Sequence, residues 1–277
     1  MPQPTLQELM QKSTTFLLGK ELPNARREVE WIFAETLTLS RLELYTRFDM
    51  PIAEPEVLAL RDRITRRGRR EPLAYVLGNQ PFRSLQLLVT PAVLVPRPET
   101  EELIDLVLVD LPLDACRILD VGTGSGAIAL ALKQARPDCT VEGTDISLEA
   151  LVVARANAEA NALEVRFHHG HLASHLITTF DRVVANLPYI GEGERAQCDP
   201  ELAHEPQIAL FAGADGLDLI RALVADAARL LAINGALWLE HGWQQGAAIA
   251  ELAASHELRS TLHRDGAGKD RFTRITR

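Results

Sequence analysis

The sequence predicts an α/β protein, in which a doubly wound and mostly parallel sheet follows a small all-helical domain. From about residue 116 onward, short apolar runs typical of buried strands alternate with segments of helical periodicity. Residues 1–80, in contrast, place their apolar residues at helical spacing. The last two strand-like segments are separated by the turn "GAGK", which predicts an antiparallel pair at the carboxyl end of the sheet.

The chain is expected to divide into two domains joined by a short linker. Residues 1–80 form the helical domain, with helices expected in 5–17, 25–37, 55–70 and 71–78. Residues 81–95 change to short, partly alternating apolar runs and are expected to form a hairpin linker. Residues 96–277 form the larger domain, and its first helix follows the two prolines of "PRPETEELIDLVLVDL".

The larger domain alternates strands and helices in chain order. Strands are expected at 116–122, 140–146, 164–169, 181–186, 236–242, 258–265 and 271–277. Helices are expected at 126–135, 147–162, 216–233 and 243–256.

Bulk composition restricts the class of protein. The chain has 277 residues and is 47% hydrophobic and 24% charged, which is ordinary for a globular protein. No apolar run approaches a membrane span, and no signal peptide is visible. The three cysteines lie far apart in the sequence, which suits a reducing cytoplasm. A net charge of −9 argues against broad, nonspecific binding of nucleic acid.

A glycine-rich loop is the first candidate binding element. Gly122, Gly124 and Gly126, with Thr123 and Ser125 between them, separate a predicted strand from a predicted helix. Asp145 ends the next strand, where an acid can bind the two hydroxyls of a ribose. The pair predicts a nucleotide-type ligand. The spacing also satisfies the relaxed dinucleotide fingerprint, so a nicotinamide cofactor stays open, although "DVGTGSG" resembles the S-adenosylmethionine loop of methyltransferases.

The tetrapeptide Asn186-Leu187-Pro188-Tyr189 ends the fourth predicted strand and is the second candidate element. The Asn186 side-chain oxygen and the Leu187 carbonyl can each accept a hydrogen from an NH₂ group. Pro188 holds Leu187 extended, and Tyr189 offers a flat face for stacking. Because ligands of open α/β sheets bind beyond the carboxyl ends of the strands, we expect this motif, the glycine loop and Asp145 to border one crevice. An ordinary strand-to-loop turn is the simpler alternative.

Together with "PRPETE", "NLPYI", "HEPQIALFAGADG" and "LEHGWQQG", these motifs resemble the peptide chain release factor glutamine methyltransferases, the PrmC/HemK family, nearly end to end. The resemblance implies an enzyme with a Rossmann-like class I methyltransferase sheet. This enzyme uses S-adenosyl-L-methionine and releases S-adenosyl-L-homocysteine. It implies a cytoplasmic enzyme that methylates the glutamine amide nitrogen in the Gly-Gly-Gln motif of class 1 release factors. The sequence departs from the family where Leu187 replaces the usual proline and where Gly170 and His171 replace an acid and a large residue.

The resemblance also assigns roles to individual residues. Catalysis and substrate binding fall to Asn186, Leu187, Pro188 and Tyr189, and Glu205 and Pro206 are expected on the substrate side. Cofactor binding is expected of the glycine loop, Arg97, Thr100, Asp145, His171 and Asn186. In the mechanism that follows, Asn186 and the Leu187 carbonyl bind both amide hydrogens, and the methyl group moves by in-line displacement without a metal.

Three other activities compete with this interpretation. An adenine methyltransferase acting on RNA or DNA is the nearest, because Asn-Leu-Pro-Tyr also occurs in rRNA adenine dimethyltransferases. A binding module without turnover and a nicotinamide oxidoreductase are the others. The acidic net charge and the end-to-end resemblance favour a protein substrate.

Two side-chain clusters are not assigned to the reaction. His168, His169, His171 and His175 lie close in sequence, but strand alternation separates neighbours, so no metal site is expected. Residues 61–70 hold six arginines, which form either a solvated helix face or a docking patch for an acidic surface of the release factor.

Overall fold

The structure is a computed structural model that describes residues 3–277, and it forms two compact units. The first unit holds residues up to Gly78 together with Pro200–His204, and the second holds Asn79–Asp199 and Glu205–Arg277. This division differs from the predicted domains in two respects. The hairpin of β1 (Asn79–Phe82) and β2 (Leu85–Leu88) belongs to the second unit, and a distant five-residue segment joins the first.

The first unit is a helical bundle, as the periodicity predicts. Its helices are α1 (Leu6–Leu18), α2 (Ala25–Leu37), α3 (Arg41–Thr46), α4 (Glu54–Gly68) and α5 (Leu73–Leu77). Thr5 and Ser40 each begin a helix with a capping box, in which the side chain accepts the backbone N–H three residues on. Helix α3 was not predicted, because its six residues are too few to establish a period.

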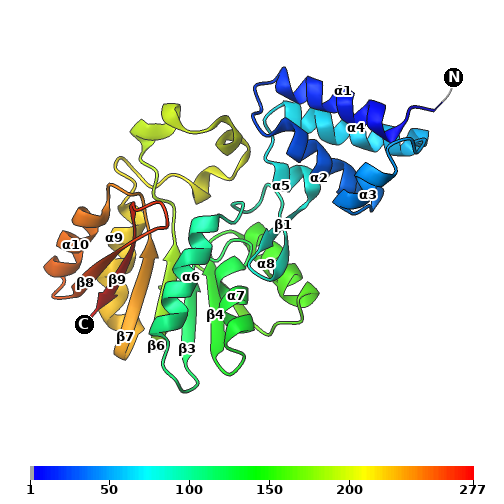
Figure 1. The fold of residues 1–277 in the computed structure, drawn as a ribbon. Coiled ribbons are helices and arrows are strands. Elements are labelled where there is room, and N and C mark those ends of the chain that lie inside the picture. The colour runs from blue at the N-terminus through cyan, green and yellow to red at the C-terminus, as the bar shows by residue number, and fades with distance from the viewer. Residues whose placement is uncertain (1–2) are drawn as a thin grey trace. The chain divides into compact units, whose positions relative to one another are not determined.

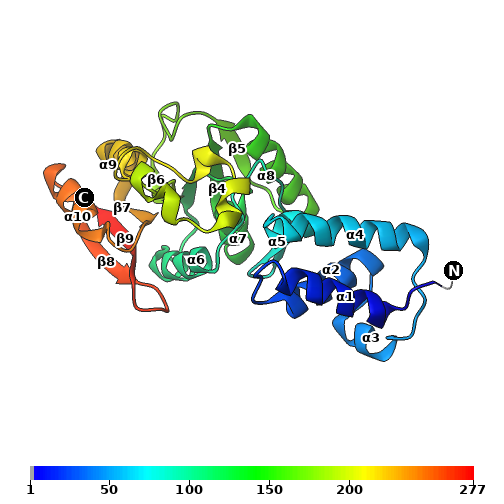
Figure 2. The same ribbon diagram turned by 90° about the horizontal axis from the view of Figure 1, so that it is seen from above.

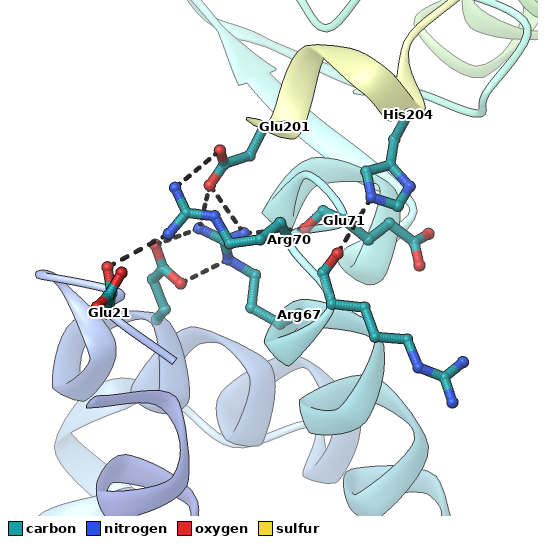
Figure 3. Close-up of polar contacts among 8 residues, drawn as sticks. Glu21, Arg67, Arg70, Glu71, Glu201 and His204 are labelled. Carbon is teal, nitrogen blue, oxygen red and sulfur yellow. Dashed lines mark hydrogen bonds and ion pairs between the residues drawn. The ribbon is translucent and has the colours of Figure 1, made fainter. Parts of the chain in front are cut away.

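Some arginines of the run in residues 61–70 bond to other residues of the first unit. Arg67 is 6% exposed at its side chain, and its Nε donates to Glu28 Oε2 at 2.7 Å. Both of its Nη atoms also lie 3.2 Å from Glu201 Oε1, and Arg70 Nη2 donates to Glu201 Oε2 at 3.0 Å (Figure 3). Arg66 pairs with Glu71 at 2.9 Å. Three of the six arginines therefore hold carboxylates of the same unit, which leaves only the other three for either alternative, a solvated face or a docking patch.

We expect the Glu201→Gln substitution to loosen the Pro200–His204 segment without unfolding the helical unit. Glu201 receives charge-assisted hydrogen bonds, and losing their charge is worth about 1.5 kcal/mol, or roughly a tenfold change in local opening. Arg67 stays neutralised by Glu28. Hydrogen–deuterium exchange of residues 200–204 measures the effect. Glu192→Gln, which breaks an exposed pair with Arg195, is the control, and equal exchange in both variants would contradict the prediction.

The second unit contains the predicted sheet. Its strands are β3 (Arg117–Val121), β4 (Thr140–Asp145), β5 (Arg166–His169), β6 (Phe180–Asn186), β7 (Leu231–Glu240), β8 (Arg259–Arg264) and β9 (Asp270–Thr276). They lie in the order β5-β4-β3-β6-β7-β9-β8. The first five pair in parallel, and β9 pairs antiparallel with both β7 and β8. The predicted α/β fold with an antiparallel carboxyl-terminal pair is confirmed.

Helices cover both faces of this sheet (Figures 1 and 2). On one face, α6 (Pro98–Asp110) and α7 (Ala127–Ala135) contribute Leu103, Ile104 and Leu130 to a core that also holds the hairpin residue Leu87. The end of α8 (Leu148–Ala160) joins this core. On the other face, α9 (Asp218–Leu230) and α10 (Gly246–Ser255) pack their apolar residues against β6 and β7. Helix α9 buries a single apolar stripe, whereas α7 is buried on nearly all sides, with six consecutive buried residues from Ala127 to Leu132.

Two stretches of the second unit differ from the prediction. Strand β7 begins at Leu231, inside the helix predicted for 216–233, because α9 ends at Leu230 and the chain then pairs with Phe180. The 3₁₀ turns Glu192–Gln197, Pro200–His204 and Gln207–Ala209 follow β6 and were not predicted.

Within residues 3–277, no helix is both long and apolar enough to cross a membrane.

Two of the three cysteines meet in space although they are far apart in the sequence. Cys116 and Cys139 are buried, and their Sγ atoms lie 2.9 Å apart as free thiols. Burial raises the pKa of the Cys116 thiol to about 12, which favours the protonated form. The two thiols pack against each other immediately before β3 and β4.

Candidate active site

The glycine loop connects β3 to α7 and is fixed by the neighbouring strand. The backbone N–H groups of Gly122 and Thr123 both donate to the Thr144 carbonyl at 2.9 Å. Gly122 has a φ of +75°, and a Cβ there would lie 2.9 Å from Leu187 Cδ2. The positive φ favours glycine, and a side chain at this position would have to displace Leu187. The loop thus packs directly against the tetrapeptide that follows β6.

Asp145 ends β4 and faces the loop. Its Oδ2 accepts the Gly124 N–H at 2.8 Å, and its Oδ1 accepts the Ser147 N–H at 2.8 Å. Each carboxylate oxygen keeps further lone pairs, so Asp145 can still accept two hydroxyl groups. The two backbone donors hold the carboxylate in one orientation toward a ligand.

These elements surround one cavity of about 450 Å³. Its walls come from the carboxyl ends of adjacent parallel strands and from the segment after β6, and include Gly122–Ser125, Thr144–Ser147, Asn186–Pro188, and residues 208–209 and 211–213. Arg97, Thr100, Gly170, His171 and Pro206 also line it. Most of the predicted site residues therefore meet in one place, as the crevice rule for open sheets leads us to expect.

Asn186 ends β6, and its side chain is tied to two neighbouring elements. Its Nδ2 donates to Thr100 Oγ1 on α6 at 3.0 Å, and Thr100 Oγ1 in turn donates to Glu240 Oε2 on β7 at 2.8 Å. Glu240 is 1% exposed and is the register partner of Asn186 across the two parallel strands. Sequence reasoning missed Glu240. Its place at the end of a predicted strand, in "LEHG", was the signal that could have indicated a position near the crevice.

Glu205 anchors the substrate-side segment and does not itself line the cavity. It is 3% exposed; its Oε2 accepts the Val95 N–H at 3.0 Å, and its Oε1 accepts Arg97 Nη2. The next residue, Pro206, lies in the cavity wall, as does Arg97. The ion pair therefore fixes both Arg97 and the start of the segment 206–213.

Tyr189 differs from its neighbours in the tetrapeptide. Among the described residues, the cavity lining includes Asn186, Leu187 and Pro188 but not Tyr189, whose ring packs against the core beneath α9. Burial raises the pKa of its phenol to about 12, and its carbonyl accepts Gln245 Nε2 at 2.8 Å. The structure gives no contact for the predicted stacking face, and a packing role accounts for the position.

His168 and His169 of the cluster bond to other groups, although the ring centroids of His168 and His175 also lie 5.9 Å apart. His168 Nε2 lies 2.8 Å from Glu142 Oε2, and His169 Nε2 lies 3.0 Å from the Ile146 carbonyl. A Cβ on Gly170 would collide with the His175 ring at 2.2 Å, which explains the glycine beside His171. Over residues 3–277, no group of three His, Cys, Asp or Glu residues is arranged to hold a metal ion.

Two carboxyls near the cavity are buried deeply enough to titrate near neutrality. Asp120 is fully buried below the glycine loop, and its Oδ2 accepts Thr123 Oγ1 at 2.6 Å and the Ala129 N–H at 3.2 Å. Burial raises the pKa of Asp120 to about 7, and burial likewise raises the pKa of Glu240 to about 7.

These raised pKa values predict that stability falls as pH rises toward neutrality. Between the ordinary Asp value of 3.8 and about 7, the unfolded chain releases the proton of Asp120 while the folded chain retains it. The free energy of unfolding therefore decreases through this window, by at most about 1.4 kcal/mol per pH unit for one group. Asp120→Asn should make the slope between pH 5 and 7 shallower in chemical denaturation, and an unchanged slope would refute the assignment.

Comparison with known proteins agrees with this architecture. Residues 8–78 match the PrmC N-terminal domain family, and residues 102–207 match the methyltransferase small domain family. The chain is 37% identical to the release factor glutamine methyltransferase of Deinococcus radiodurans, over 98% of both chains. It is 41% identical to the protein of that name from Neisseria gonorrhoeae, over 84% of this chain and 87% of the relative.

Solved structures share the fold over most of the chain. A methyltransferase from Pyrococcus furiosus superposes with a TM-score of 0.53 at 20% identity, covering 70% of this chain and 88% of that one. The hMettl16 catalytic domain superposes with a TM-score of 0.54 at 14% identity, covering 80% and 81% of the two chains. At these identities the likeness concerns the fold alone.

Proposed function

The chain belongs to the release factor glutamine methyltransferase family, and from this premise we propose that it methylates the side-chain amide nitrogen of the glutamine in the Gly-Gly-Gln motif of class 1 release factors. As a member of this family it is a methyltransferase, and S-adenosylmethionine is its methyl donor. One observation carries the proposal. Asn186, Leu187 and Pro188 line the same cavity as Gly122–Ser125 of the glycine loop and Asp145, so an amide and a nucleoside can be held side by side.

The residues of the cavity fit the methyl donor. Asp145 has two orientated carboxylate oxygens for the ribose hydroxyls, and Gly124, at a φ of +54°, has open space where a side chain would stand. Ala127 and Ile128 at the start of α7 add apolar wall for the rest of the nucleoside. S-adenosylmethionine, when bound, supplies an electrophilic methyl group on a positively charged sulfur.

The chain's own contribution concerns the weak nucleophile. An amide nitrogen shares its lone pair with the carbonyl, so it attacks poorly unless it is orientated and its developing positive charge is stabilised. The Asn186 Oδ1 and the Leu187 carbonyl each accept one amide hydrogen, and Pro188 restrains Leu187 in an extended conformation. Both acceptors favour the charge that develops on nitrogen, and the surplus proton leaves to solvent afterwards.

The partner in this proposal is a protein, and the reaction takes place in the cytoplasm, where release factors act. Glu205 and the segment 206–213 are proposed to shape the side of the cavity that the glutamine enters, because Glu205 fixes that segment to Val95 and Arg97. The net charge of −9 supports a protein substrate over a nucleic acid.

A competition assay tests the proposal. The enzyme receives labelled S-adenosylmethionine with a class 1 release factor, the same factor with its motif glutamine changed to alanine, and adenine-containing RNA and DNA. We expect label only on the release factor that retains its motif glutamine. Label on adenine, with none on the factor, would instead mean that Asn186 and Leu187 bind the amino group of a base.

A further inference from the structure

The side chain of Asn186 can face the cavity with either its oxygen or its nitrogen, and only one choice suits the proposed reaction. An NH₂ group on the substrate needs acceptors, so the oxygen has to face it. The two ends of an amide are nearly isosteric, and the shape of the cavity alone does not select between them. A neighbouring group of fixed polarity must therefore make the choice.

The contacts behind Asn186 supply this polarity. An ionised carboxylate has only acceptors, so Glu240 Oε2, 2.8 Å from Thr100 Oγ1, takes the hydroxyl proton of Thr100. Thr100 Oγ1 then has only lone pairs left for its other neighbour. The Asn186 atom 3.0 Å away must be the donor, Nδ2, and the oxygen is turned away from Thr100.

Burial makes this chain of hydrogen bonds selective. Thr100 is 4% exposed and Glu240 is 1% exposed, so water competes little for either group. A buried donor or acceptor left unsatisfied is expensive, and the reversed amide would set the Asn186 oxygen against the lone pairs of Thr100 Oγ1. The three side chains come from β6, α6 and β7, so the arrangement is fixed by the fold and not by one flexible loop.

We propose that Glu240 is a positioning residue for the methyl transfer: through Thr100 it turns the Asn186 amide so that Oδ1 faces the cavity. This inference rests on the proposed function, because the required orientation follows from an NH₂ substrate. Glu240 touches neither substrate nor donor in this arrangement. It acts by fixing the direction of the Thr100 hydroxyl and through its own hydrogen-bonding interaction with the Asn186 amide, which also favours Nδ2 on that side.

Protonation of Glu240 on Oε2 reverses this chain of hydrogen bonds. A protonated carboxyl donates to Thr100 Oγ1, which frees the Thr100 hydroxyl to donate to Asn186 and favours the wrong amide orientation. The charges that face Glu240 are Arg271 on β9, which favours ionisation, and Glu99 on α6, which opposes it; the Tyr189 phenol after β6 is neutral. With the pKa of Glu240 near 7, kcat should rise with pH through neutrality.

The test compares hydroxyl-deleting and hydroxyl-retaining variants with a release factor as substrate. We expect Thr100→Val to lower kcat by about 10- to 100-fold while the Kd for S-adenosylmethionine, measured by calorimetry, changes less than threefold. Thr100→Ser should recover most of the lost kcat. Thr273→Val, which deletes another buried hydroxyl that bonds His241, is the matched control and should keep kcat.

Glu240→Gln gives the second readout. Because a glutamine does not ionise, the rise of kcat through neutral pH should disappear, and kcat at pH 8 should fall about tenfold. Wild-type kcat and pH dependence in both Thr100→Val and Glu240→Gln would overturn the inference while the proposed function stood. No transfer to the release factor by the wild-type enzyme would instead remove the proposed function, and the inference with it.

Discussion

Asn186→Ala is expected to lower kcat for glutamine methylation by about 10²- to 10³-fold, the range found when one transition-state hydrogen bond is removed. The substitution deletes the acceptor that is proposed to hold one amide hydrogen and leaves the Leu187 carbonyl as the other. The nitrogen then rotates more freely and loses stabilisation of its developing charge. The fold should persist, because Asn186 is only partly buried and its loss leaves Thr100 bonded to Glu240.

Binding of the methyl donor separates this effect from a general collapse of the site. The Asn186 side chain bonds Thr100, whereas Asp145 and the glycine loop hold the nucleoside in our account. Stopped-flow or quench-flow single-turnover rates, together with the Kd for S-adenosylmethionine, measure the two quantities in one variant. A rate and an affinity that fall by the same factor would show that Asn186 supports the donor site and not the amide.

Asp145→Ala should show the opposite pattern, with the Kd for S-adenosylmethionine raised about 100-fold. Two charge-assisted hydrogen bonds to the ribose, each worth about 1.5 kcal/mol or more, would be lost. The deletion also frees the Gly124 and Ser147 N–H groups, which Asp145 now holds at 2.8 Å. Single-turnover rates at saturating donor should fall much less than the affinity does.

Asp145→Asn provides the matched comparison for this second prediction. Asparagine keeps the shape and one acceptor oxygen but has no charge, so its affinity should lie between those of the wild type and Asp145→Ala. Isothermal titration of S-adenosylhomocysteine measures all three proteins without turnover. An affinity for the alanine variant within threefold of the wild type would contradict the assignment of Asp145 to the ribose.

The sequence predicted the crevice well because strand ends obey a simple geometric rule. The strands that end at Val121, Asp145 and Asn186 are parallel neighbours, so the residues that follow them must meet at one edge of the sheet. The glycine loop was identifiable since positive φ angles at Gly122 and Gly124 leave glycine as the favoured residue. The residues at the ends of these strands that border the crevice could therefore be predicted from the sequence alone.

Contacts that depend on which strands pair, or on tertiary packing, could not be predicted in the same way. Glu240 lies beside Asn186 only because β7 pairs with β6, and the residues of β7 do not state which strand will be their neighbour. Arg70 and Glu201 lie 131 positions apart and meet through tertiary packing, so the arginine run resembled an exposed helix face. Leu231 belongs to β7 although its surroundings have helical periodicity, because its pairing with Phe180 of β6 outweighs the local pattern.

The most direct test of the account is a crystal structure of the chain with S-adenosylhomocysteine and a release factor whose Gly-Gly-Gln motif is intact. We predict that the glutamine amide nitrogen lies about 3 Å from both Asn186 Oδ1 and the Leu187 carbonyl oxygen, with Asn186 Nδ2 on Thr100. A glutamine amide bound elsewhere in the cavity, or an Asn186 side chain that turns its nitrogen toward the substrate, would contradict the proposed mechanism.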